Sequence, residues 1–81
     1  MAEISSSLED YIEAVYSIYI KDNKVKAVDV ARRLNVSRAS VTEALQKLEQ
    51  IGLINYGHYG TISVTDDGVK KAKEVIKKQK M

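Results

Sequence analysis

The chain of 81 residues contains no cysteine, proline, tryptophan or phenylalanine, and it has a single histidine. Without cysteine it can form neither a disulfide nor a thiolate metal site. It also lacks a glycine-rich phosphate loop and a nucleophile motif, so we expect no enzymatic activity. Its N-terminus does not resemble a signal peptide and its apolar runs are too short to span a membrane. We therefore expect a cytoplasmic protein without membrane contacts.

Charge is distributed unevenly along the chain, although the net charge is only +2. Residues 21–47 hold seven basic and three acidic side chains, and residues 68–81 hold six lysines and one glutamate. A polyanion would therefore meet two basic regions rather than a uniformly basic protein. For the C-terminal lysines, a solvated helix face is the simpler interpretation.

Apolar residues recur at helical spacing in four segments, and two β-branched runs lie between the third and the fourth. The predicted helices are Ser7–Lys21, Val28–Leu34, Ser37–Ile51 and a last one that begins after Thr65. The predicted strands are Leu53–Tyr56 and Thr61–Val64, and Lys24–Lys26 is a short extended segment. The expected helix caps are Ser7, Ser37 and Thr65 at the N-terminal ends, with Asn35 and Gly52 after the C-terminal ends. The expected inward-facing residues are Leu8, Ile12, Val15, Tyr16, Tyr19, Val30, Ala31, Leu34, Val41, Ala44, Leu45, Leu48, Val69, Ala72, Val75 and Ile76.

This order of elements is that of a winged helix-turn-helix domain. We therefore predict a mainly α fold with a small β-hairpin, forming one domain over residues 1–81. Within it, Val28–Ile51 predicts the helix pair that binds double-stranded DNA, because a short helix and a tight turn precede a longer, serine-capped helix.

The N-terminal side chains of that longer helix are expected to face base edges in the major groove. Arg38 suits a guanine or a phosphate, Glu43 a cytosine amine and Ala39 a thymine methyl, while serine and threonine hydroxyls suit phosphates. The predicted DNA-binding residues are Lys26, Ser37, Arg38, Ala39, Ser40, Thr42, Glu43, Lys47, His58 and Tyr59.

Simpler roles stay open for several of these residues. Ser37 is first of all a helix cap, and Glu43 is almost equally well explained as a solvated acid. His58 and Tyr59 occupy the hairpin tip, where a wing meets DNA, but a lone histidine at a loop tip is usually just exposed. Helix-turn-helix surfaces also bind proteins, so a protein-interaction module is an alternative. The basic run from Lys21 to Arg38 favours DNA.

Asp10 and Glu13 lie three residues apart, on one face of the first predicted helix. Two carboxylates placed in this way can share a hard divalent cation such as Mn²⁺. On spacing alone, a pair of solvated surface acids is the better explanation, because helix surfaces often carry such pairs.

The segment Leu8–Tyr16 (LEDYIEAVY) resembles the opening helix of the diphtheria toxin repressor family, and most closely its manganese transport regulator branch. The similarity covers nearly the whole chain and includes Val28–Ala31, Ser40–Thr42, Gln46–Leu48, and Gly60–Thr65 followed by Gly68. The resemblance implies a homodimeric repressor that binds operator DNA when Fe²⁺ or Mn²⁺ is present. Its metal ligands would come from the first helix and from a C-terminal dimerisation domain, which we expect to be absent from this chain.

The resemblance also assigns a metal role to Asp10 and Glu13, which match the two first-helix ligands of the manganese branch. Iron-responsive members typically have methionine at position 10, and an aspartate there suits Mn²⁺. The family's histidine ligand near the end of the last helix aligns with Gln79, which is a poor ligand. The resemblance therefore implies an incomplete site that does not bind Mn²⁺ or Fe²⁺ tightly in this chain alone. A metal-independent winged-helix regulator remains an alternative.

Overall fold

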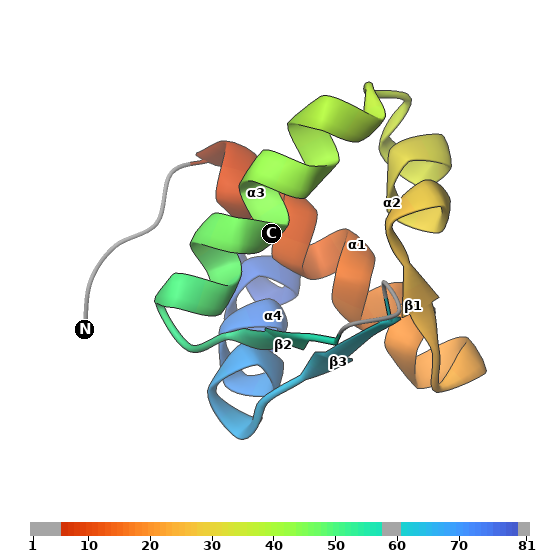
Figure 1. The fold of residues 1–81 in the computed structure, drawn as a ribbon. Helices are drawn as coiled ribbons and strands as arrows, with labels where there is room; N and C mark the ends of the chain where they lie inside the picture. Colours follow the sequence, from red (N-terminus) through yellow and green to blue (C-terminus); the bar gives the residue numbers. More distant parts are fainter. Residues whose placement is uncertain (1–5, 58–60, 80–81) are drawn as a thin grey trace.

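The computed structural model describes residues 6–57 and 61–79, which fold into helices packed on a small antiparallel sheet (Figure 1). In chain order these ranges form α1 (Ser6–Asp22), β1 (Val25–Lys26), α2 (Ala27–Leu34), α3 (Arg38–Gln50), β2 (Ile54–Tyr56), β3 (Thr61–Val64) and α4 (Asp66–Gln79). The predicted winged helix-turn-helix fold is confirmed, and its sheet has one strand more than the predicted hairpin.

Both ends of α1 differ slightly from the prediction. Ser7, the expected N-cap, lies inside the first turn, so this prediction is wrong. Three consecutive serines at positions 5–7 are equivalent caps, and the sequence does not distinguish among them. At the other end, Asn23 adopts a φ of 61°, and its N–H donates to the Tyr19 carbonyl at 2.8 Å. A left-handed asparagine thus ends the helix one residue later than predicted.

The sheet has the strand order β1-β3-β2, and both pairings are antiparallel. The segment predicted only as extended contributes β1, in which Val25 faces Ile62 and Lys26 faces Thr61 across the ladder. Val25 and Ile62 are both buried, so this pair joins the sheet to the core. β2 is consequently an outer strand.

Leu53 was predicted to begin the first strand of the hairpin, but β2 begins at Ile54. The Leu53 N–H donates to the Leu48 carbonyl at 3.0 Å, and the Leu53 carbonyl accepts from the Thr65 N–H at 3.1 Å. Its backbone groups are therefore bound to α3 and to the residue before α4, and they are not available to the ladder.

The core is one cluster, and α1 packs against all three other helices and β3. In Figure 1, α1 passes behind α3, and α4 lies on the side of α1 away from α2. The predicted inward-facing residues that are buried are Ile12, Val15, Val30, Ala31, Val41, Ala44, Leu45, Leu48, Ala72 and Val75. The others are partly buried, namely Leu8, Tyr16, Tyr19, Leu34, Val69 and Ile76.

Across residues 6–57 and 61–79, no helix combines the length and the apolarity needed to cross a membrane.

Candidate nucleic-acid interface

The turn between α2 and α3 is set by Asn35, which has the left-handed angles φ 56° and ψ 50°. The Asn35 N–H donates to the Arg32 carbonyl at 3.4 Å, and the Val36 N–H donates to the Ala31 carbonyl at 3.1 Å. These two bonds close the end of α2 and turn the chain sharply. Because asparagine tolerates this conformation better than most residues, the predicted tight turn is confirmed at the predicted residue.

Ser37 caps α3, as predicted. Its Oγ accepts a hydrogen bond from the Ser40 N–H at 3.1 Å, and its hydroxyl donates to the Ser40 Oγ at 3.0 Å. The cap satisfies a free N–H at the start of the helix and holds both hydroxyls at its exposed end. The position of the first turn of α3 is therefore defined by its own sequence.

α3 has one buried and one exposed face. Val41, Ala44, Leu45 and Leu48 are buried, whereas the residues predicted to face DNA lie on the outside. The exposed members of that set are Arg38, Ala39, Ser40, Glu43 and Lys47, together with the cap Ser37, and Thr42 is half-buried. The fold thus presents most of the predicted DNA-binding residues on one continuous, solvent-facing helix.

Glu43 and Lys47 form an ion pair one turn apart, with 3.6 Å between Nζ and Oε1. The two side chains are 73% and 58% exposed, so solvent screens the attraction and the pair contributes little to stability. Glu43 therefore has a solvated partner on its own helix. This pairing fits a surface acid, and it fits a residue that contacts a base equally well.

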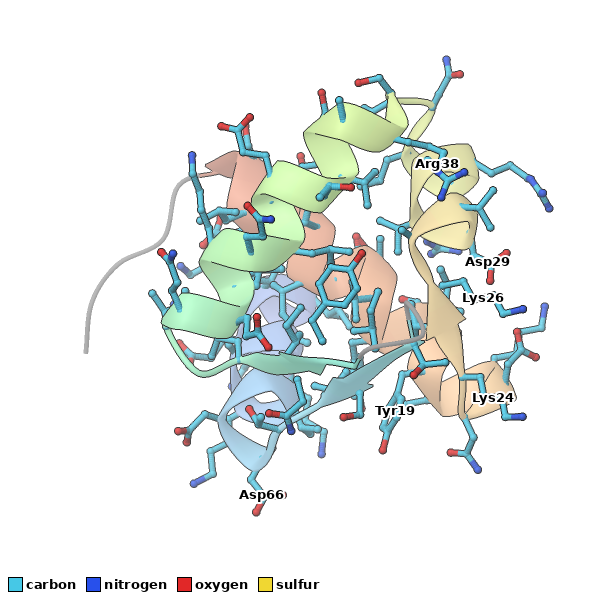
Figure 2. The ribbon with its side chains drawn as sticks, in the orientation of Figure 1. Tyr19, Lys24, Lys26, Asp29, Arg38 and Asp66 are labelled. Atoms are coloured by element: carbon cyan, nitrogen blue, oxygen red, sulfur yellow. The ribbon has the colours of Figure 1, made fainter. Side chains whose placement is uncertain are left out.

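Lys26 is the last residue of β1 and immediately precedes α2. Its side chain is exposed, and its cross-strand neighbour is Thr61 at the start of β3. Figure 2 shows Arg38, Lys26 and Lys24 along one edge of the molecule. They run from the start of α3, through β1, to the short segment that joins α1 to β1. His58 and Tyr59, the predicted wing-tip contacts, lie outside the described residues.

The junction between α3 and the wing, which is the hairpin of β2 and β3, contains a contact that the sequence did not predict. The Glu49 carboxylate, in the last turn of α3, accepts from the Tyr56 N–H of β2 at 3.1 Å. Gly52 makes the turn between them with a φ of 82°. An acid seven residues before a strand residue is not a recognisable motif, so only the fold reveals this contact.

Thr65 and Gly68 fix the other side of the same junction. The Thr65 hydroxyl donates to the Gly52 carbonyl at 2.6 Å, and the Gly68 N–H donates to the Thr65 Oγ1 at 3.0 Å. The predicted capping role of Thr65 is thus confirmed, with an additional bond back to the turn. Gly68 packs directly on the Leu53 carbonyl, where a Cβ atom would collide.

The two candidate metal ligands lie on α1, where Asp10 is exposed and Glu13 is half-buried. The last turn of α4 contacts the neighbouring acid Glu9, because Lys78 Nζ lies 3.7 Å from Glu9 Oε2. Among the described residues, no group of three or more histidine, cysteine or acidic side chains could hold a metal ion. Two carboxylates are fewer ligands than Mn²⁺ or Fe²⁺ requires, so these residues alone do not form a complete metal site.

The chain resembles known regulators in both sequence and structure. Residues 3–62 match the family described as iron dependent repressor, N-terminal DNA binding domain. An uncharacterized HTH-type transcriptional regulator of Methanocaldococcus jannaschii is 37% identical over 79 residues, covering 95% of this chain and 62% of that protein. The transcriptional regulator MntR of Bacillus subtilis is 33% identical over 70 residues, covering 86% of this chain and 49% of that protein. The chain spans about half the length of the curated relatives it matches.

Solved structures support the same fold. Wild-type ZitR of Lactococcus lactis superposes with a TM-score of 0.78 at 26% identity, covering 94% of this chain and 51% of ZitR. A mutant of the same ZitR, solved in complex with DNA, superposes with a TM-score of 0.73 at 26% identity, covering 89% of this chain and 50% of that protein.

Proposed function

We propose that this chain, which belongs to the iron-dependent repressor family through the N-terminal DNA-binding domain, binds double-stranded DNA with α3 and the wing. The observation that carries the proposal is the exposed first half of α3, which Ser37 and the left-handed Asn35 hold in a defined position. A helix presented in this way fits the major groove of B-DNA. Matching regulators, one of them solved with DNA, support the same function.

In this proposal the predicted residues contact different parts of the DNA. Arg38 contacts a guanine or a phosphate, and Ala39 allows the helix to approach a thymine methyl closely. Lys26 neutralises a backbone phosphate at the edge of the interface, and His58 and Tyr59 contact the backbone from the wing tip. The remaining proposed contacts are those of Ser37, Ser40, Thr42, Glu43 and Lys47.

At the level of the whole protein, we propose a metal-responsive transcriptional repressor that acts in the cytoplasm. Residues 1–81 would be its DNA-binding domain, and dimerisation would place two copies of α3 in successive major grooves, about 34 Å apart. The family description and the relatives named as transcriptional regulators support this proposal.

For the metal, we propose that Asp10 and Glu13 supply two oxygen ligands to a site completed by other donors. Their shared helix face, the exposure of Asp10 and the partial exposure of Glu13 support this role. Oxygen ligands of this kind suit Mn²⁺. When bound, the ion would stabilise one arrangement of the domains.

The DNA-binding proposal predicts steeply salt-dependent binding to a duplex and a specific loss in Arg38→Ala. This variant should bind roughly tenfold more weakly, and the slope of log K against log salt should fall by about one. Arg38→Lys should keep the slope, because its charge is retained, but should lose any bidentate contact with guanine. Fluorescence anisotropy with a labelled duplex, over a series of salt concentrations, measures both quantities.

Lys73→Ala is the control for that experiment, because it removes a charge from an exposed position on α4. It should leave the affinity and the salt slope close to those of the wild type, if the α4 lysines form a solvated face. Duplex binding that is absent at low salt, or that is insensitive to both salt and Arg38, would contradict the proposal. It would instead favour the protein-interaction module.

The metal proposal predicts that Gln79→His increases the affinity for Mn²⁺. The histidine would add a third ligand to Asp10 and Glu13, and affinity should rise roughly ten- to a hundredfold, the scale on which single groups act at metal sites. Isothermal titration with Mn²⁺ measures the change. Asp10→Asn in the Gln79→His background should reverse it, whereas Lys77→His is a control for an additional histidine on the same helix. Equal Mn²⁺ affinities in all these variants would favour a metal-independent regulator.

A further inference from the structure

We propose that Glu49 is a positioning residue for DNA binding, because its carboxylate holds the wing at a set angle to α3. The inference rests on the proposed DNA-binding function and goes further, because it assigns a role in affinity to an acidic residue that need not touch DNA. The structural basis is the 3.1 Å hydrogen bond that Glu49 Oε2 accepts from the Tyr56 N–H.

The register of the sheet explains why the Tyr56 N–H is available. In an antiparallel ladder, successive residues direct their backbone groups alternately toward the partner strand and away from it. The Gly57 N–H donates to the Thr61 carbonyl at 2.8 Å, so the neighbouring Tyr56 N–H points away from β3. Because β2 is an outer strand of the described sheet, that donor meets no strand and pairs with the carboxylate instead.

The other hydrogen bonds of the junction hold the near end of the wing. Leu53 is bound to Leu48 and Thr65, and the Thr65 hydroxyl is bound to Gly52, so the turn after α3 is fixed to the start of α4. Tyr56 is the last residue of β2, on the side of the wing tip. Of the hydrogen bonds described here, the Glu49 contact is the one that joins this far end of β2 to α3. It therefore ties this end of β2 to α3, while the pairing of Lys26 with Thr61 holds the neighbouring strand of the wing.

Two electrostatic effects disfavour an acid at this position. Glu49 lies in the last turn of α3, where the helix dipole disfavours negative charge. It also adds a negative charge next to a surface proposed to bind a polyanion, which weakens association. Removing the carboxylate should therefore improve DNA binding by charge alone, whereas loss of the wing's orientation should reduce it. These opposite signs allow an experiment to separate the two effects.

The test compares Glu49→Ala and Glu49→Gln with the wild type by fluorescence anisotropy, using a fluorescein-labelled, mixed-sequence duplex. Glu49→Ala should bind roughly three- to tenfold more weakly, the loss of one hydrogen bond that pre-orients a contact. Glu49→Gln keeps an acceptor oxygen and loses the charge, so it should bind at least as tightly as the wild type. Glu74→Ala, which removes an exposed acid from α4, is the matched charge control and should not weaken binding.

An NMR readout distinguishes positioning from a general loss of stability. In Glu49→Ala, hydrogen exchange at the Tyr56 amide should increase while the core amides stay protected. In Glu49→Gln, which keeps an acceptor oxygen, the Tyr56 amide should stay as protected as in the wild type. A Tyr56 amide that exchanges equally fast in the wild type and in Glu49→Ala would overturn the proposal.

The duplex experiment also separates the failure of this inference from that of the proposed function. If the wild type binds the duplex and Glu49→Ala binds as tightly as Glu74→Ala, only the role of Glu49 is wrong. If the wild type does not bind duplex DNA at low salt, the proposed function fails, and the inference fails with it.

Discussion

Gly68→Ala should destabilise the domain by about 3 kcal/mol, although the same change in an ordinary helix stabilises it by up to about 1 kcal/mol. A Cβ at this position would collide with the Leu53 carbonyl and would lie 2.7 Å from Val64 Cγ1. The carbonyl cannot move freely, because it accepts the Thr65 N–H at 3.1 Å. The start of α4 would have to move away from the turn after α3, and the Thr65 bonds to Gly52 and Gly68 would be lost.

Thermal unfolding followed by circular dichroism measures this effect. For a domain of this size, a loss of about 3 kcal/mol corresponds to a fall in Tm of at least about 12 °C. Lys70→Ala, at an exposed position in the same helix, is the control and should change Tm little. A Tm for Gly68→Ala equal to or above that of the wild type would mean that α4 is not seated on Leu53 as described.

Ala39→Glu should abolish duplex binding while leaving the fold intact. The side chain of Ala39 is exposed in the first turn of α3, where the helix dipole favours an acid, so stability should be unchanged or slightly higher. In the proposed complex the same carboxylate would face the negative charge of the major groove. Like charges brought together at an interface cost several kcal/mol, so affinity should fall by at least about a hundredfold.

Duplex anisotropy and thermal unfolding on the same samples test both halves of this prediction. Lys73→Gln changes the net charge by the same amount on α4, so it controls for the overall loss of positive charge. If Ala39→Glu and Lys73→Gln bind the duplex equally well, the first turn of α3 does not enter the groove. The proposed recognition surface would then be wrong, even with the fold unchanged.

Several of the signals that shape this fold are local. The caps at Ser37 and Thr65 and the left-handed turns at Asn35 and Gly52 were predictable, because each depends on the residue itself and a few neighbours. The buried face of α3 was predictable for the same reason, since its periodicity is a property of the helix alone. Ser7 shows the limit of such signals, because three adjacent serines are equivalent caps.

The candidate site was predictable in part. Most of the predicted DNA-binding residues belong to α3. They are exposed because the apolar stripe of this helix lies on its other side. The contact of Glu9 with Lys78 in the last turn of α4 was not predictable from spacing, because it depends on how α1 and α4 pack. The expectation of a third metal ligand near the end of the last helix came only from the resemblance to a family.

The sequence by itself determined the identity and order of the elements, since helix periodicity, caps and turn residues act over a few positions. Only the tertiary structure decided how these elements are joined. Three contacts depend on backbone groups whose partners are brought together by folding. They are the pairing of Lys26 with Thr61, the packing of Gly68 on the Leu53 carbonyl, and the hydrogen bond that the Tyr56 N–H donates to Glu49. Backbone donors and acceptors are the same in every residue, so the sequence does not specify which of them will meet.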